Sequence, residues 1–160
     1  MRTVKASLQK EKGTLNRFFS ACVGAGRAGE VMRHIPMQQL RRMQAECPFR
    51  YIRFHGLFHE EMNLVSRDEN GNLCFSFRYI DQLFDMLLEN GLRPIAELGL
   101  MPVELAKDEE YVFWWKMNKS MPRDISEWEL LIEAFNCRGC KRDQTRDLQR
   151  YVRSLQRSGG

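Results

Sequence analysis

The sequence has no long apolar run, and no segment approaches the roughly 18 residues that a helix needs to cross a bilayer. The start, MRTVKASLQKEKGTLNR, carries charge but lacks the apolar stretch of a secretory signal peptide. The five cysteines are odd in number and scattered, which is typical of reduced thiols rather than of a disulfide framework. We therefore expect a cytoplasmic protein that does not contact a membrane.

The charge is distributed unevenly along a chain whose composition, 43% hydrophobic and 29% charged, is that of a globular domain. Residues 137–160 hold seven basic and two acidic side chains, whereas residues 1–136 hold 18 basic and 19 acidic ones. We divide the chain into a polar N-terminal segment (1–17), a main domain (18–135) and a basic tail (136–160). Arginines recur every three or four residues in this tail, and such a stripe can bind nucleic acid. We favour a solvated terminus and do not expect a nucleic-acid partner.

Short apolar runs alternate with helical patterns along the main domain. We predict strands over 18–24, 49–56 and 92–99, and helices over 36–46, 77–91 and 122–135. The Asn70-Gly71 pair predicts a small hairpin before the second helix. Alternation of this kind indicates an α/β fold with parallel strands, either a doubly wound sheet or part of a (β/α)8 TIM barrel. Three units are too few to close a barrel, which needs about 250 residues.

The stretch CVGAGRAG contains Gly24, Gly26 and Gly29 in the G-x-G-x-x-G pattern of a dinucleotide-binding turn. In such a turn the helix begins inside the motif, whereas Pro36 indicates a later helix start and a long loop over residues 26–35. The next strand also ends without a carboxylate for the ribose, although an arginine can adapt such a site to a phosphorylated ribose. We interpret the glycines as loop formers that border a site, and we expect no cofactor. An NAD(P)-binding domain is the less favoured alternative.

Two short motifs resemble metal sites but lack the required context. His55 and His59 are four residues apart, yet Gly56 stands where a zinc protease has glutamate, and the pair follows a strand rather than lying on a helix. Cys137 and Cys140 form a lone C-x-x-C without a second pair and after a helix. We predict no metal site, and we interpret His59 as a solvated loop residue. His55 is of more interest because it ends a strand, where barrel enzymes place their sites.

Glu97 and a pair of tryptophans are the remaining candidate site residues. Glu97 falls inside the otherwise apolar strand PIAELG, so it either faces a ligand or forms a structural pair with a neighbouring strand, for example with Arg53. Trp114 and Trp115 offer aromatic faces that suit the apolar side of a sugar ring. The alternative is that a tryptophan packs in the core, and we expect this for one of the two adjacent residues.

The set of RFHG, ELGLMP and the FWW…N…P loop, together with CVGAGRAG, resembles glycoside hydrolase family 39 of the β-xylosidase type. The resemblance runs from about Cys22 to Phe135, in order and with loops of matching length. It implies the first three βα units of a (β/α)8 barrel that hydrolyses β-xylosides or related sugars with retention, through two glutamates. It also implies that His55 contacts the sugar in the −1 subsite and that Trp114 walls the pocket. Glu97 is in register with a family glutamate, without an assigned acid or nucleophile role.

The sequence departs from this family in one respect that decides activity. The family's acid/base glutamate lies in an Asn-Glu-Pro motif and its nucleophile in a later strand, and Asn-Glu-Pro does not occur here. The resemblance ends where the basic tail begins. From this coincidence we infer that the chain is a truncated, frameshifted gene product. We expect a glycosidase fragment that binds a β-xyloside weakly, has no catalytic carboxylates of its own, and self-associates through exposed barrel edges.

Overall fold

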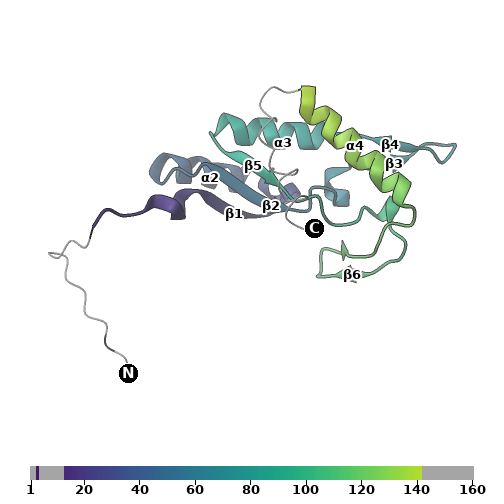
Figure 1. Ribbon diagram of the computed structural model, residues 1–160, viewed down its shortest axis with the longest axis horizontal. Coiled ribbons are helices and arrows are strands. Elements are labelled where there is room, and N and C mark those ends of the chain that lie inside the picture. The colour runs from purple at the N-terminus through teal and green to yellow at the C-terminus, as the bar shows by residue number, and fades with distance from the viewer. Residues whose placement is uncertain (1–2, 4–12, 142–160) are drawn as a thin grey trace.

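Three parallel strands form the main sheet of the chain, for which the computed structural model describes residue 3 and residues 13–141. The strands are β1 (Cys22–Arg27), β2 (Tyr51–His55) and β5 (Arg93–Ala96), and β2 pairs with both of the others. Helices α2 (His34–Glu46), α3 (Arg78–Glu89) and α4 (Ile125–Lys141) follow these strands in turn (Figure 1). The predicted βα alternation with parallel strands is therefore confirmed.

The connections between these units carry short elements. They are η1 (Arg17–Ser20), α1 (Ala28–Val31), η2 (Glu60–Met62), β3 (Val65–Arg67), β4 (Leu73–Phe75), η3 (Val103–Leu105), β6 (Tyr111–Val112) and β7 (Met117–Asn118). The arginine stripe of the predicted tail, from Arg142 to Arg157, lies outside the described residues. Helix α4 itself continues past the predicted boundary at residue 135. Among the described helices, none combines the length and the apolar character that a membrane span requires.

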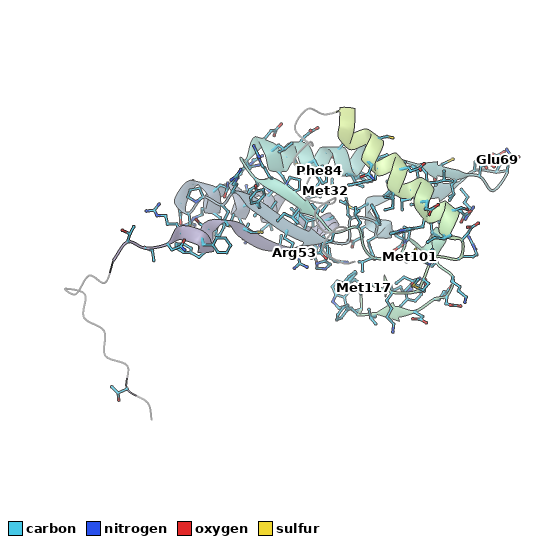
Figure 2. All side chains as sticks on the ribbon, in the orientation of Figure 1. Met32, Arg53, Glu69, Phe84, Met101 and Met117 are labelled. Atoms are coloured by element: carbon cyan, nitrogen blue, oxygen red, sulfur yellow. The ribbon has the colours of Figure 1, made fainter. Side chains whose placement is uncertain are left out.

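The sheet is covered by helices on one face. Side chains alternate across a strand, and in β2 the buried Ile52 and Phe54 alternate with the less buried Tyr51, Arg53 and His55. The buried face packs against the core, which includes apolar residues of α3 (Figure 1). Figure 2 shows Arg53 on the side of the sheet away from α3, and Phe84 on the α3 side. The opposite face of the sheet therefore stays open along the described chain.

Helix α3 has the apolar face that its sequence period predicts. Ile80, Leu83, Phe84 and Leu87 are buried, and the ring centroids of Phe54 and Phe84 lie 6.5 Å apart in an edge-on arrangement. Full burial of side chains of this size stabilises the fold by roughly 1.5–3 kcal/mol each. Because this contact places Phe54 on the covered face of β2, its sequence neighbours Arg53 and His55 lie on the open face.

The first predicted strand is displaced along the sequence. Residues 17–20 form the 3-10 turn η1, where the Asn16 carboxamide oxygen accepts the N–H of Phe18 at 2.9 Å. Phe18 and Phe19 are exposed rather than buried, so the apolar run is not a core strand. Strand β1 starts at Cys22 and includes Gly24 and Gly26. The interpretation of these two glycines as loop formers is therefore wrong.

The predicted long loop over residues 26–35 is also wrong. It contains α1, at whose start the Glu30 carboxylate accepts both the backbone N–H of Arg27 at 3.2 Å and the Arg27 Nη2 at 2.9 Å. Helix α2 then begins at His34, two residues before Pro36, because proline is tolerated within the first turn, where the N–H has no helical partner.

Two further boundaries differ from the expectation, and one small element is confirmed. Strand β5 ends at Ala96, so Glu97 follows the strand instead of lying within it. The long loop after it contains the antiparallel hairpin β6–β7. The hairpin predicted at Asn70-Gly71 is present as β3–β4, and its turn is held by the Asp68 carboxylate, which accepts backbone N–H groups of Asn70 and Asn72.

Gly91 ends helix α3 with a left-handed backbone conformation, φ +71°. An alanine Cβ there would meet only the Gln44 Nε2 at 3.8 Å, an ordinary contact, so a substitution acts through the backbone alone. We predict that Gly91→Ala lowers the free energy of unfolding by about 1 kcal/mol, measured by urea titration. Gly99→Ala is the control, because Gly99 has open space around it and no positive φ. Equal stability of the two variants would contradict this explanation of the helix end.

Candidate functional site

The carboxyl ends of the three parallel strands bring candidate side chains to one edge of the sheet. Arg27 ends β1 and pairs in register with His55 at the end of β2, while Glu97 directly follows β5. Because β2 is the middle strand, His55 lies between the other two. Parallel α/β folds place their ligand sites at this edge.

The loop after β5 returns to the same edge and places an indole beside His55. The hairpin β6–β7 holds a turn over residues 113–116, in which Phe113 and Lys116 adopt positive φ values of 61° and 55°. The ring centroids of Trp115 and His55 lie 5.6 Å apart. Backbone conformations of this kind are uncommon for residues other than glycine and gather at functional sites. We call Arg27, His55, His59, Trp114 and Trp115 the strand-end cluster.

His59 is buried in this cluster, so its interpretation as a solvated residue is wrong. Its Nδ1 accepts the backbone N–H of Glu61 at 3.3 Å, and its Nε2 lies 2.9 Å from the carbonyl oxygen of Trp115. With Nδ1 as an acceptor, Nε2 carries the proton and donates it to that carbonyl. The partner is 56 residues further along the chain, which is why local sequence gave no sign of it.

The two tryptophans differ in their surroundings. Trp115 is half-buried and stacks on Phe113 with ring centroids 5.7 Å apart and an angle of 11° between the planes. Trp114 is 84% exposed, and the Arg27 guanidinium lies 5.3 Å from its ring centroid. Sequence reasoning selected Trp114 as the pocket wall, and that role stays a prediction. Trp115, which the sequence offered beside Trp114 as a candidate aromatic face, is the indole that contacts His55.

Glu97 forms the structural pair that was one of its two predicted roles. Its Oε1 lies 2.9 Å from Nη2 of Arg53, and both side chains are partly exposed. Arg53 and His55 are two residues apart in β2 and so share the open face of the sheet. The pair therefore lies on the face that carries His55. The alternative role of Glu97, facing a ligand, stays a prediction.

Arg27 is the member of the cluster that sequence reasoning missed. It is only 3% exposed, and its guanidinium lies 2.9 Å from the Glu30 carboxylate and 3.1 Å from that of Glu61. It also lies 4.9 Å from the centroid of the Trp115 ring. A buried charge is costly unless it is paired, and here two acids pair with it. The sequence signal was present as an arginine inside the glycine motif, at a strand end.

The side-chain hydrogen bond from Arg27, and then the backbone N–H of the same residue, lower the pKa of Glu30 below its ordinary value of 4.5. Cysteine, histidine and acidic side chains in the described part of the chain form no group of three arranged to hold a metal ion. The strand-end cluster thus offers the half-buried His55 imidazole beside indole faces, while the charge of the buried Arg27 is compensated by Glu30 and Glu61. Such a combination suits a neutral, hydroxyl-rich ligand.

Three parallel βα units with side chains gathered at the carboxyl ends of the strands form a partial α/β sheet, and folds of this class bind ligands at that edge. The family model of Glycosyl hydrolases family 39 matches residues 2–152. The chain belongs to this family, as its sequence motifs indicated.

Similar proteins cover most of this chain but are much longer. It is 40% identical to a beta-xylosidase of Caldicellulosiruptor saccharolyticus over 124 residues. This matched region covers 78% of this chain and 25% of that protein. A beta-xylosidase of Geobacillus stearothermophilus is 37% identical over 116 residues, 71% of this chain and 23% of that protein. The chain therefore spans about a quarter of the length of these relatives.

Solved structures agree with this placement. A family 39 enzyme from Xanthomonas axonopodis pv. citri superimposes with a TM-score of 0.72 and 35% identity, over 78% of this chain and 24% of that one. A monomeric beta-xylosidase from Caulobacter crescentus gives a TM-score of 0.72 and 36% identity, over 80% of this chain and 26% of that one. The fold is thus that of a partial, TIM-barrel-like α/β segment.

Glu30 gives the site a measurable pH dependence. Since its pKa is lowered in the folded chain, its carboxylate stabilises the fold above the ordinary pKa and loses that effect as the pH falls through the folded value. We predict that wild type exceeds Glu30→Gln in unfolding free energy at pH values above the ordinary pKa of Glu30, and that the difference shrinks as the pH falls below that value. Urea titrations across this range measure it.

Glu46→Gln is the matched control, because Glu46 pairs with Arg42 on an exposed helix face. Its difference from wild type should stay near zero throughout. A Glu30→Gln difference that does not vary with pH would contradict the role of the Arg27 bond.

Proposed function

We propose that this chain forms the first three βα units of a retaining glycoside hydrolase of the β-xylosidase type, and that its strand-end cluster is part of the sugar pocket. The observation that carries the proposal is His55, which ends the middle strand of the sheet and faces the Trp115 ring at 5.6 Å. Membership of family 39 and the likeness to beta-xylosidases supply the substrate class.

The chemistry of the cluster suits a pyranose ring. A half-buried imidazole can donate to or accept from sugar hydroxyls, while an indole packs against the apolar face of the ring. In this proposal His55 binds the sugar in the −1 subsite and the exposed Trp114 walls the pocket. Glu97, held by Arg53, accepts hydrogen bonds from sugar hydroxyls on the open face of the sheet.

The open face of the sheet supports a place within a larger barrel. Parallel sheets are normally covered on both faces, whereas β2 here is covered on one. In the described part of the chain, β1 and β5 each pair with β2 alone and keep one edge unpaired. We assign these edges to the remaining strands of a (β/α)8 barrel. In the isolated chain, the same edges would promote self-association.

Sugar binding by the chain is testable residue by residue. We predict that methyl β-xyloside perturbs the NMR signals of His55, Trp114 and Glu97, and that His55→Ala abolishes the perturbation by removing the imidazole hydrogen bond. His34→Ala is the control, because His34 lies on α2 and contacts Gln38, away from the cluster. Indistinguishable titrations of both variants and wild type would contradict the proposed site.

Hydrolysis by the 160-residue chain is the second test. Retaining hydrolysis needs two carboxyl groups about 5–5.5 Å apart, one as acid and one as nucleophile. The Asn-Glu-Pro motif that carries the family's acid/base does not occur in this sequence. We predict no release of nitrophenol from an aryl β-xyloside above the rate of a buffer blank. Turnover that His55→Ala abolishes would show that the chain carries its own catalytic pair.

A further inference from the structure

The glycines of the G-x-G-x-x-G motif differ in the space around them. A Cβ on Gly26 would lie 2.6 Å from Oε2 of Glu30, and a Cβ on Gly29 would lie 2.7 Å from Oε2 of Glu61. Real Cβ atoms do not approach other atoms so closely. A Cβ on Gly24, by contrast, would meet nothing within 4 Å. Two of the three glycines therefore make room for carboxylates of the chain itself.

Those two carboxylates are the partners of Arg27, which lies between the two glycines in sequence. Glu30 Oε1 accepts from Nη2 at 2.9 Å, while its Oε2 accepts the Arg27 backbone N–H at 3.2 Å. Glu61 Oε1 lies 3.1 Å from Nη1, a buried atom without a hydrogen bond of good geometry. Nη1 is thus held chiefly by the charge of Glu61, so displacing that carboxylate leaves a buried cation poorly compensated.

The clamped guanidinium lies against both tryptophans. Its central carbon is 5.3 Å from the Trp114 ring centroid and 4.9 Å from that of Trp115. Trp115 in turn is the ring beside His55 and His59. Cation–π contacts are stronger where the cation is removed from water, as Arg27 is. A line of direct contacts thus joins the glycine motif to His55.

We propose that the glycine motif is an arginine clamp: Gly26 and Gly29 admit the carboxylates of Glu30 and Glu61, which hold Arg27 so that it fixes the Trp115 indole beside His55. Arg27 is a positioning residue, and this role in the sugar pocket rests on the proposed function. We expect a lysine to replace it poorly, because a compact ammonium on a flexible stem does not reproduce the fixed donor geometry of the planar guanidinium.

The three glycines provide the test in the full chain. We expect Gly26→Ala and Gly29→Ala to move the His55 Hε1 and Trp115 indole N–H resonances, since the ring beside His55 shifts. Gly24→Ala, in open space, should leave both resonances in place. Gly29 lies in α1, and alanine has a higher helix propensity than glycine. If Gly29→Ala acted only on this helix, it would stabilise α1 and leave the His55 and Trp115 resonances unchanged.

Arg27→Lys and Glu61→Gln give a second measurement if a glycine variant does not fold. Both should shift the same two resonances while the far-UV circular dichroism stays that of wild type, and Arg42→Lys on an exposed ion pair should shift neither. Unmoved resonances in all clamp variants would overturn the proposal. These spectra are recorded without sugar, so they test the clamp even if methyl β-xyloside does not bind. Where it does bind, the dissociation constant should rise several-fold in Arg27→Lys and stay unchanged in Gly24→Ala.

Discussion

The parallel pairing of β2 with strands on both sides is the constraint on which the rest of the structure depends. It brings Arg27, His55 and Glu97, which are far apart in sequence, to one edge of the sheet. The alternation along β2 then divides its side chains between two environments. Ile52 and Phe54 enter the core under α3, so Arg53 and His55 must lie on the opposite face. A shift of one residue in this strand would bury the polar set and expose the core set.

The second constraint is the return of the loop after β5 to that same edge. The sheet alone would leave His55 without an aromatic neighbour, and the turn over residues 113–116 supplies one. Three contacts to Trp115 hold it there: the His59 imidazole on its carbonyl, the Phe113 ring stacked on its indole, and the Arg27 guanidinium near its ring. The positive φ values of Phe113 and Lys116 are stabilised by these contacts, of which those from His59 and Arg27 come from distant parts of the chain.

The parts of the fold that the sequence predicted are those set by local periodicity. The buried face of α3 follows from apolar spacing, and the β3–β4 hairpin follows from Asn70-Gly71. Side-chain partners could not be found in this way when they lie far apart in sequence. His59 was misinterpreted because its partner is the backbone of Trp115, and Arg27 was missed because one of its acids lies in η2. The start of β1 was misplaced because Phe18 and Phe19 are apolar yet exposed, which hydrophobicity alone cannot reveal.

The glycine motif shows how one sequence pattern can serve two different kinds of anion. Glycine without a Cβ allows a negatively charged group to approach the backbone closely, which a pyrophosphate does in dinucleotide folds. In this chain the approaching groups are the carboxylates of Glu30 and Glu61. The residue that decides between the two is Arg27, because a buried cation inside the motif needs anions from the same chain to compensate its charge. The spacing of glycines therefore indicates close approach by an anion, and the charged residues within and after the motif indicate where that anion comes from.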